Sequence, residues 1–313
     1  MKIINLLSEI KVYIIFLCFL ALTQKATGQQ IPHISQFMHN QLVYNPAAAG
    51  MHETQFNTNV LSRIQWSSIK GAPLTHLFWS DYRFPGDRMA LGVNVMQESF
   101  GAHKNTDLLG NFSYNIPLTR KLKLAMGLRL GASFYRYNPS MLSNVWDDGD
   151  PLLFFDSRNS TLPKAGAGFQ LQSKNMYLGF SAPDLIVSDR DDIFDNKDLS
   201  LFQKRRNYIL MGGYTIKLND SYNLLPNLRI IYFPGSGYRA DINLIGEISD
   251  YFWAGASYST IKSYTFMAGT HISSRMRFGY SYEFRLRSEV LIPLNTHELN
   301  LMINLDNLTK KTK

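Results

Sequence analysis

The sequence predicts an all-β protein: a transmembrane antiparallel up-and-down β-barrel of about fourteen strands, with a short N-terminal periplasmic segment. Two patterns indicate this fold. Between residues 54 and 306 the chain divides into short segments in which apolar and polar residues alternate, and the connections between these segments alternate between short and long. An outer-membrane barrel requires both patterns, because each strand faces lipid on one side and a polar lumen on the other.

The segment 121–137 shows the alternation most clearly. One face is apolar and carries Leu122, Leu124, Met126, Leu128, Leu130, Ala132 and Phe134. The other face carries Arg129 together with small and polar residues. An α-helix would spread the apolar residues around its surface, since its period is about 3.6 residues. The segments 238–248, 275–285 and 297–306 repeat the pattern.

Charged side chains gather on one face of these segments. An Arg or Lys at the centre of a bilayer costs roughly 2–4 kcal/mol, so the charged face is expected to line the lumen. The predicted lumen charges are Arg129, Arg239, Asp241, Glu247, Arg275 and Arg277. Buried charges need partners, so we expect them to pair inside the barrel. A soluble β-sandwich or propeller also has alternating strands, but neither explains the asymmetry of the connections.

The connections predict the orientation of the barrel. If both chain ends lie in the periplasm, every even-numbered connection faces the periplasm, and these connections are short: 84–88, 117–120, 173–175, 219–222, 249–250 and 273–274. Among the outward-facing connections, 138–162 and 183–205 are long and 287–295 is intermediate. Short periplasmic turns and long extracellular loops are typical of outer-membrane barrels.

Residues 1–28 are predicted to be a secretory signal peptide. The apolar stretch 12–22 is too short to span a membrane, and Ala26 and Gly28 are the small residues expected before a cleavage site. The one cysteine, Cys18, lies in this peptide, so the mature chain has no thiol or disulfide. The precursor charge of +8 is scattered over turns and strand faces, which argues against nucleic-acid binding. Residues 307–313 are a basic C-terminal tail that follows the barrel, residues 54–306.

Residues 29–53 form the predicted N-terminal periplasmic segment. Its apolar residues are spaced loosely like one face of a helix until Asn45 and Pro46 end the pattern. This segment is expected to plug the lumen from below, to dock on a periplasmic partner, or to cap the base of the barrel.

No catalytic residue, cofactor or metal site is predicted. None of the histidines has metal-ligand spacing beside a third ligand, and His33 and His39 are expected to be solvated or to cap the N-terminal segment. The long connections are acidic, with carboxylates at Asp147, Asp148, Asp150, Asp184, Asp189, Asp191, Asp192, Asp195 and Asp198. We interpret them as solvated or partner-docking surfaces, with a calcium site as the alternative. A barrel hydrolase, the enzymatic alternative, would need a Ser–His or Asp–His pair.

Several short stretches resemble one family. The stretch 34–38 reads Ile-Ser-Gln-Phe-Met and is followed by Tyr-Asn-Pro-Ala-Ala-Ala-Gly at 44–50. Both are similar to the opening of the PorP/SprF family of Bacteroidetes outer-membrane proteins. The stretches 63–66, 71–73, 279–283 and 297–299 resemble its first outer hairpin and its closing strands. The motif residues, taken as candidates for partner contact, are Gln36, Tyr44, Asn45, Pro46, Gly50, Arg63, Trp66, Pro73, Glu283, His297 and Glu298.

The resemblance implies a function and partners. Members of the family serve the type IX secretion system and gliding motility, and none is known as an enzyme. They support secretion and surface attachment of substrates such as adhesins with a C-terminal sorting domain. Some connect the outer membrane to a periplasmic ring. The expected partners are therefore outer-membrane lipid, a secreted substrate and ring components, without nucleic acid. The alternative function is a general, porin-like solute channel.

Overall fold

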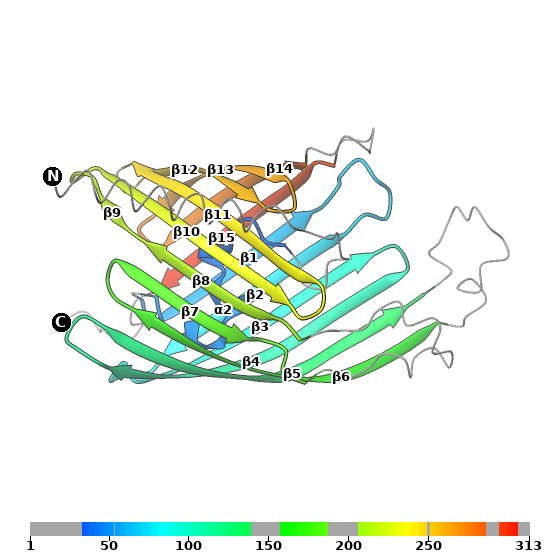
Figure 1. Ribbon diagram of the computed structural model, residues 1–313, viewed down its shortest axis with the longest axis horizontal. Coiled ribbons are helices and arrows are strands. Elements are labelled where there is room, and N and C mark those ends of the chain that lie inside the picture. Colours follow the sequence, from blue (N-terminus) through cyan, green and yellow to red (C-terminus); the bar gives the residue numbers. More distant parts are fainter. Residues whose placement is uncertain are drawn as a thin grey trace.

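The computed structural model describes residues 33–52, 54–138, 157–186, 206–248, 251–285 and 294–305. The strands form one antiparallel sheet that closes on itself (Figure 1). They are β1 (Phe56–Ile64), β2 (Leu74–Arg83), β3 (Met89–Phe100), β4 (His103–Pro117), β5 (Lys123–Tyr137), β6 (Arg158–Gln172), β7 (Met176–Ala182), β8 (Tyr208–Tyr214), β9 (Ile216–Lys217), β10 (Tyr222–Phe233), β11 (Gly237–Ile248), β12 (Phe252–Ser259), β13 (Ser263–Ser273), β14 (Met276–Arg285) and β15 (Thr296–Leu305).

Each strand pairs with its neighbours in the sequence, and the last closes on the first. Strands β1 and β15 are in register from Phe56 opposite Leu305 to Ile64 opposite His297. Strands β8 and β9 both pair with β10 and are separated only by Thr215, so they occupy one position in the wall. The barrel therefore has fourteen strand positions, and the predicted fold class is confirmed.

The two ends of the barrel differ in their connections. Short turns join β2 to β3, β4 to β5, β6 to β7, β9 to β10, β11 to β12 and β13 to β14, and we call this end the turn end. The longer connections lie at the opposite end, the loop end. Strand β6 already begins at Arg158, so the connection predicted at 138–162 is shorter than expected. The acidic stretches 146–150 and 189–198, on which the calcium alternative depended, lie outside the described residues.

Side chains along the strands of the wall alternate between the outside of the barrel and the lumen. Leu128 and Leu130 are 61% and 69% exposed on the outside, whereas Arg129 between them is 3% exposed and faces the lumen. Three aromatic rings, those of Tyr135, Tyr137 and Trp253, also face inward and are buried, because they share the parity of the lumen residues. No helix in the described part of the chain is both long and apolar enough to cross a membrane.

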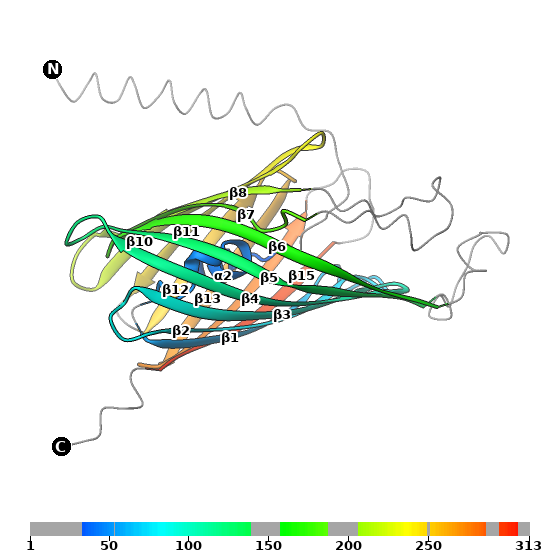
Figure 2. The same ribbon diagram turned by 90° about the horizontal axis from the view of Figure 1, so that it is seen from below.

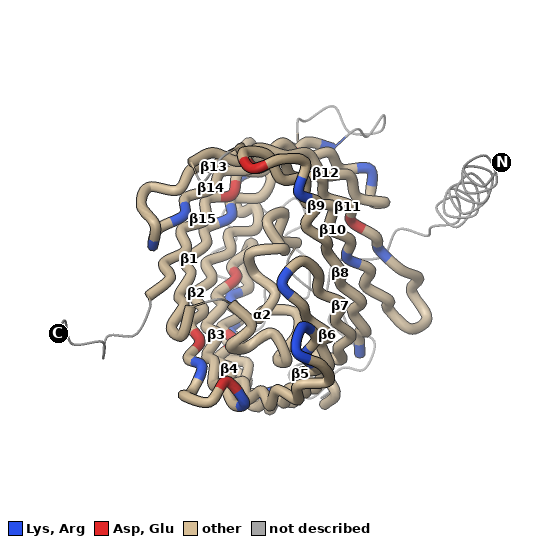
Figure 3. Tube along the Cα trace, turned by 90° about the vertical axis from the view of Figure 1, so that its left-hand side faces the viewer, with Lys and Arg blue, Asp and Glu red and all other residues tan. Residues whose placement is uncertain are grey.

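Residues 33–50 lie inside the barrel, and we call this segment the plug. It contains the 3-10 helix η1 (Phe37–His39), the short α-helix α2 (Gln41–Tyr44) and the 3-10 helix η2 (Pro46–Ala48). Figures 2 and 3 show α2 within the ring of strands. Its apolar residues pack against the inward side chains of the wall, with Ile34, Phe37, Leu42, Tyr44 and Ala49 in one cluster with Leu61, Leu77, Trp79, Ile209 and Ile231.

The plug runs along the lumen from the loop end toward the turn end. His33 contacts Asp241 and Glu283, which lie toward the loop end of β11 and β14. Gly50 contacts Asp81, which lies near the turn end of β2. The described part of residues 29–53 thus lies in the lumen, but it begins toward the loop end and does not enter from below, as was expected of a plug.

Placing a charge on the outer face should destabilise the barrel. Leu128 lies in the middle of the exposed face of β5, so Leu128→Arg should lower the free energy of unfolding in lipid vesicles by about 2–4 kcal/mol. Urea titration followed by tryptophan fluorescence measures this loss. Leu118→Arg, in a turn at the turn end, is the control and should cost about 0–1 kcal/mol. Equal losses for both variants would contradict lipid contact at Leu128.

Candidate functional site

The plug owes its shape to its own sequence. The Asn45 side chain accepts a hydrogen bond from the Ala47 N–H (3.0 Å) and so caps η2, and Pro46 occupies the first position of that helix. Gly50 ends the plug at a φ of 70°, where a Cβ would collide with Ala90. Small residues allow the closest approach to the wall, because any side chain at Gly127 of β5 would overlap the backbone of Pro46 and Ala47.

Glu298 of β15 holds the beginning of the plug. Its carboxylate accepts hydrogen bonds from the backbone N–H groups of Ser35 and Gln36, each at 2.9 Å. Arg63 of β1 donates to Glu298 (3.1 Å), to Glu283 (2.6 Å) and to the Ser35 hydroxyl (3.0 Å). Arg63, Glu283 and Glu298 are at most 1% exposed. The charges are thus removed from water, and the one guanidinium pairs with both carboxylates.

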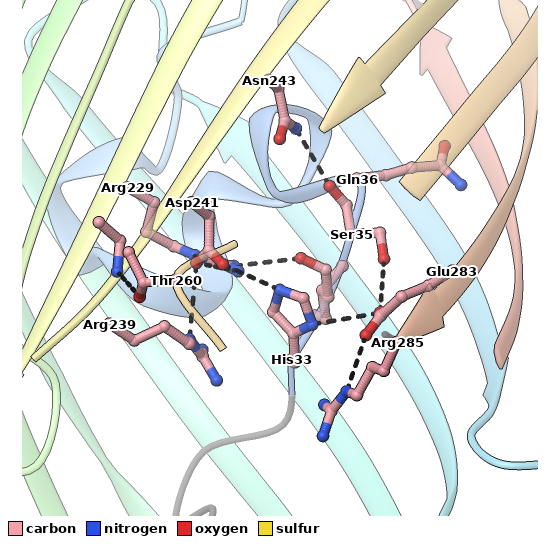
Figure 4. A network of polar contacts seen from close by, with 12 residues as sticks. His33, Ser35, Gln36, Arg229, Arg239, Asp241, Asn243, Thr260, Glu283 and Arg285 are labelled. Atoms are coloured by element: carbon pink, nitrogen blue, oxygen red, sulfur yellow. Dashed lines mark hydrogen bonds and ion pairs between the residues drawn. The ribbon is translucent and has the colours of Figure 1, made fainter. Parts of the chain in front are cut away.

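His33 connects the plug to two strands of the wall. Its Nε2 lies 3.2 Å from Asp241 of β11, and its Nδ1 lies 3.3 Å from Glu283 of β14 (Figure 4). The side chain is 4% exposed, so of the two roles expected for His33, solvated or capping, the solvated one is wrong. Because the imidazole bridges two carboxylates, it ties the start of the plug to two strands that are separated in the wall by β12 and β13.

Arg229 of β10 is a cation of the wall that contacts the plug at several points. Its guanidinium donates to Asp241 through Nε (2.9 Å) and to the carbonyl oxygen of Ile34 (3.2 Å). The same group lies over the rings of Phe37 and Tyr44, at 4.5 and 4.7 Å from their centroids. Desolvated cation–π contacts of this kind are worth up to about 2 kcal/mol. Arg229 therefore binds both the polar and the aromatic part of the plug.

Amide side chains hold the middle of the plug. Asn40 accepts hydrogen bonds from Asn59 of β1 and from the indole of Trp79 of β2 (2.9 Å), and it donates to Asn300 of β15 (3.4 Å). On the opposite wall Asn45 donates to the Phe169 carbonyl of β6 (3.0 Å). Neutral partners are sufficient here, since this part of the plug carries no charge.

Charged side chains of β5 and β2 fix α2 and the end of the plug. Arg129 of β5 donates to the carbonyl oxygens of Leu42 and Val43, which the short helix α2 leaves without helical partners. Asp81 of β2 accepts from the Gly50 N–H (2.6 Å), and Arg83 donates to the His52 carbonyl (2.8 Å). These contacts satisfy the buried backbone at the point where the chain leaves the lumen for β1.

The predicted lumen charges divide into two groups. Arg129, Arg239 and Asp241 are buried in the lumen, and Arg277 forms an ion pair with Glu247 at 3.1 Å. Arg275 is not in the lumen: it precedes β14 in an exposed turn, because the strand begins one residue later than the alternation suggested.

The residues of the family motif also lie in different places: most belong to the plug or contact it, and three lie elsewhere. Gln36, Tyr44, Asn45, Pro46, Gly50, Arg63, Glu283 and Glu298 all belong to the plug or to its contacts with the wall. Trp66 lies in the β1–β2 connection at the loop end, under the guanidinium of Arg285, and the Pro73 carbonyl accepts from Gln65 in the same connection. His297 lies among tyrosines on the outer face of β15, hydrogen-bonded to Tyr280 (2.8 Å).

Some residues of the site were not predicted. Arg229, Trp79 and Asp81 hold the plug, yet the sequence singled out none of them. The same period-two rule would have placed each of them inside, since they alternate with less buried residues along β10 and β2. Ser35 and Asn40 could not be identified as site residues from the sequence, because their hydrogen-bond partners come from distant strands.

A model of the family described as "Type IX secretion system membrane protein PorP/SprF" matches residues 26–303. The chain belongs to the PorP/SprF family. The resemblance of its opening motif is thereby confirmed, and in the structure that motif is the plug. This PorP/SprF protein is an outer-membrane barrel of the type IX secretion system, and its family and fold are of a non-enzymatic kind.

Solved structures resemble the barrel. The CymD monoaromatic hydrocarbon channel aligns with a TM-score of 0.51 and 12% identity, over 90% of this chain and 95% of that chain. Omp33, an outer membrane protein of Acinetobacter baumannii, aligns with a TM-score of 0.48 and 8% identity, over 80% and 98%. At such low identity the likeness to CymD shows the fold alone. No curated protein sequence matches the chain.

The carboxylates of the site are paired with arginine side chains. Within the described ranges, no three His, Cys, Asp or Glu side chains are grouped so that they could hold a metal ion. The buried carboxylates Asp241, Glu283 and Glu298 are all engaged by arginine. The arrangement is suited to holding a peptide segment through its backbone.

The docking of the plug should weaken in acid. Burial lowers the pKa of His39, in the plug, well below its ordinary value of 6.5, and the charge of Arg277 lowers it further, as do His52 and His271 to a smaller degree. The undocked chain therefore binds a proton at a higher pH than the docked chain, and acidification below 6.5 favours the undocked state. Fluorescence of Trp253, whose ring lies 5.4 Å from His39, should report the change. His39→Gln should flatten the pH dependence, and an unchanged profile in this variant would contradict the assignment.

Proposed function

We propose that this barrel supports secretion and surface attachment of a partner protein through the type IX machinery, and that it is not a general solute channel. The observation that carries this proposal is the plug. It takes hydrogen bonds or ion pairs from β1, β2, β3, β4, β5, β6, β7, β10, β11, β14 and β15. It also packs against inward apolar residues of β8, β12 and β13.

The lining of the lumen argues against free diffusion. A porin lumen is polar and filled with water. Here the inward polar side chains are buried and bound to the plug, as for Asn59, Arg63 and Asn243, at 0–1% exposure. Fourteen strands also enclose less room than the 16–18 of a porin. Opening this lumen to solute would require breaking many buried charged contacts at once.

The two ends of the barrel offer different surfaces to partners. Exposed charged residues in the described turns at the turn end are mostly basic (Figure 3), namely Arg88, Arg120, Lys121, Lys174, Lys217 and Arg275, with Asp87 and Asp220 as the acidic ones. This surface suits an acidic partner, and we assign it to periplasmic ring components. The loop end would then meet the secreted substrate, an adhesin with a C-terminal sorting domain in the case of gliding. Cleavage of the signal peptide after Gly28 would precede docking of the plug.

Purified protein in planar bilayers should show little steady conductance. Displacing the plug should raise it, because the lumen would then fill with water. Gly127→Leu places a side chain where the backbone of Pro46 and Ala47 lies, so it should increase conductance toward that of a barrel lacking residues 33–50.

The matched control is Gly110→Leu on the neighbouring strand. Gly110 faces outward, and a side chain there meets no atom closer than 3.7 Å. This variant should conduct like the wild type. Porin-like conductance of the unmodified protein would reject the plugged-barrel reading and favour the solute channel.

Deleting the gene should impair secretion of one surface protein while bulk solute uptake stays unchanged. Immunoblots of cell-surface, periplasmic and culture fractions would show a substrate that is trapped or shed. Cross-linking from native membranes, with identification of bound proteins, would name the substrate and the ring component. Normal surface attachment of all substrates combined with slower solute uptake would contradict the proposal.

A further inference from the structure

Two cations lie directly opposite each other on the outer face of the barrel. Lys104 of β4 is paired with Arg136 of β5 in the strand register, near the loop end of both strands. Both side chains are exposed, whereas Tyr135 and Tyr137 on either side of Arg136 are buried. Side chains opposite each other in an antiparallel pair have Cβ atoms about 4.5–5.5 Å apart, and like charges in this position destabilise the sheet. An anion bound between the two cations would remove that repulsion.

The described part of the chain supplies no carboxylate to this pair. Within it, neither the Lys104 nor the Arg136 side chain takes part in an ion pair or a hydrogen bond. The acidic residues of the adjacent stretches, Glu98 of β3 and Asp107 of β4, have the opposite, inward parity. The two positive charges are therefore left on the outer surface without a counter-charge from these strands.

Hydrogen-bonding side chains flank the two cations in the same row of the sheet. Ser99 of β3 is opposite Lys104, and Asn159 of β6 is opposite Arg136, so both share the outward parity. The row across β3, β4, β5 and β6 therefore carries a hydroxyl, an ammonium, a guanidinium and an amide. An arginine presents a planar fork of donors that fits two oxygens of a phosphate, and a lysine adds a compact charge.

The row continues the lipid-facing surface of the barrel. Leu108 and Ala132 are opposite each other on the same outer face, four residues nearer the turn end than the two cations, and Phe134 between the two rows is 46% exposed. Four residues extend about 13 Å along a strand. This is about 10 Å along the membrane normal at the usual strand tilt of about 35–45°. The cations therefore lie at the level where lipid headgroups border the hydrocarbon.

Another sector of the barrel carries aromatic rings at its loop end. On the outer face Phe180 of β7, Tyr208 of β8 and Tyr232 of β10 stack on one another, with ring centroids 6.3 and 6.5 Å apart. Aromatic rings suit the headgroup layer through their amphipathic character and need no particular lipid. The sector of β3 to β6 instead presents two adjacent charges, which are compensated only by an anion.

We propose that the row formed by Ser99, Lys104, Arg136 and Asn159 binds the phosphate of a membrane lipid in the leaflet at the loop end. A lipid phosphate is the anion that lies at this depth of a membrane. The apolar surface next to the row, at Leu108, Ala132 and Phe134, would contact the acyl chains of the same molecule. The site faces the membrane, so it is independent of the plug and of any secreted partner.

Lipid binding by the full mature protein tests the site. Titration in detergent, followed by native mass spectrometry, should show tighter binding of phosphatidic acid than of phosphatidylcholine, whose phosphate is neutralised by its own choline. Lys104→Gln combined with Arg136→Gln should weaken binding of phosphatidic acid by at least about 10-fold, the loss expected for charged hydrogen bonds. Without acidic lipid this double variant should unfold at the same temperature as the wild type or higher, because the repulsion between the two cations is removed.

The matched control removes the same charge elsewhere at the loop end. Arg206 precedes β8 and Lys262 lies between β12 and β13, and both are exposed. Arg206→Gln combined with Lys262→Gln should therefore leave binding of phosphatidic acid unchanged. Arg136→Lys keeps the charge but loses the planar fork, so it should weaken binding less than the double variant at Lys104 and Arg136.

Three results would overturn the site. Equal binding of the two lipids would show that the row does not recognise an anionic phosphate. An equal loss in the control variant would show that net charge alone attracts the lipid. Inorganic phosphate is the third probe: if it raises the unfolding temperature of the wild type as much as phosphatidic acid does, the row takes free phosphate and the assignment to a lipid is wrong.

Discussion

The structure depends on one constraint: a peptide segment with few charges of its own is held in the lumen by buried charges of the wall. Glu298 accepts the backbone N–H groups of Ser35 and Gln36, and Arg63 neutralises that carboxylate. Removing either partner would leave an unpaired charge in a closed space, which typically costs about 3–5 kcal/mol. The wall and the plug therefore require each other, and the polar inner face of the barrel is complete only when residues 33–50 are in place.

This mutual requirement connects the fold to the function. A barrel whose inward residues faced only water could conduct solutes, and sequence alternation alone does not distinguish such a lumen from a filled one. Here Arg229 binds a carbonyl of the plug and two of its aromatic rings, and Arg129 binds two further carbonyls. Both recognise the plug largely through its backbone and its shape. The opening motif of the family is thus a structural part of the barrel.

Much of this could be read from the amino-acid sequence. Period-two alternation placed Leu128 outside and Arg129 inside, because neighbouring residues in a strand point to opposite faces. The same rule, applied to every strand, also accounts for the aromatic rings of Trp253, Tyr135 and Tyr137, which are buried because their parity is inward. Arg275 shows the limit of the rule, since parity has no meaning once the residue lies in a turn.

What the sequence by itself determined is the strand pattern, the closure into a barrel and the family, because each depends on local spacing or on short motifs. Only the tertiary structure decided what fills the lumen and which charges meet. His33 joins Asp241 and Glu283 although more than 200 residues separate it from either. No local pattern encodes such pairs, because closing the sheet brings together strands from opposite ends of the chain around a segment that precedes them all.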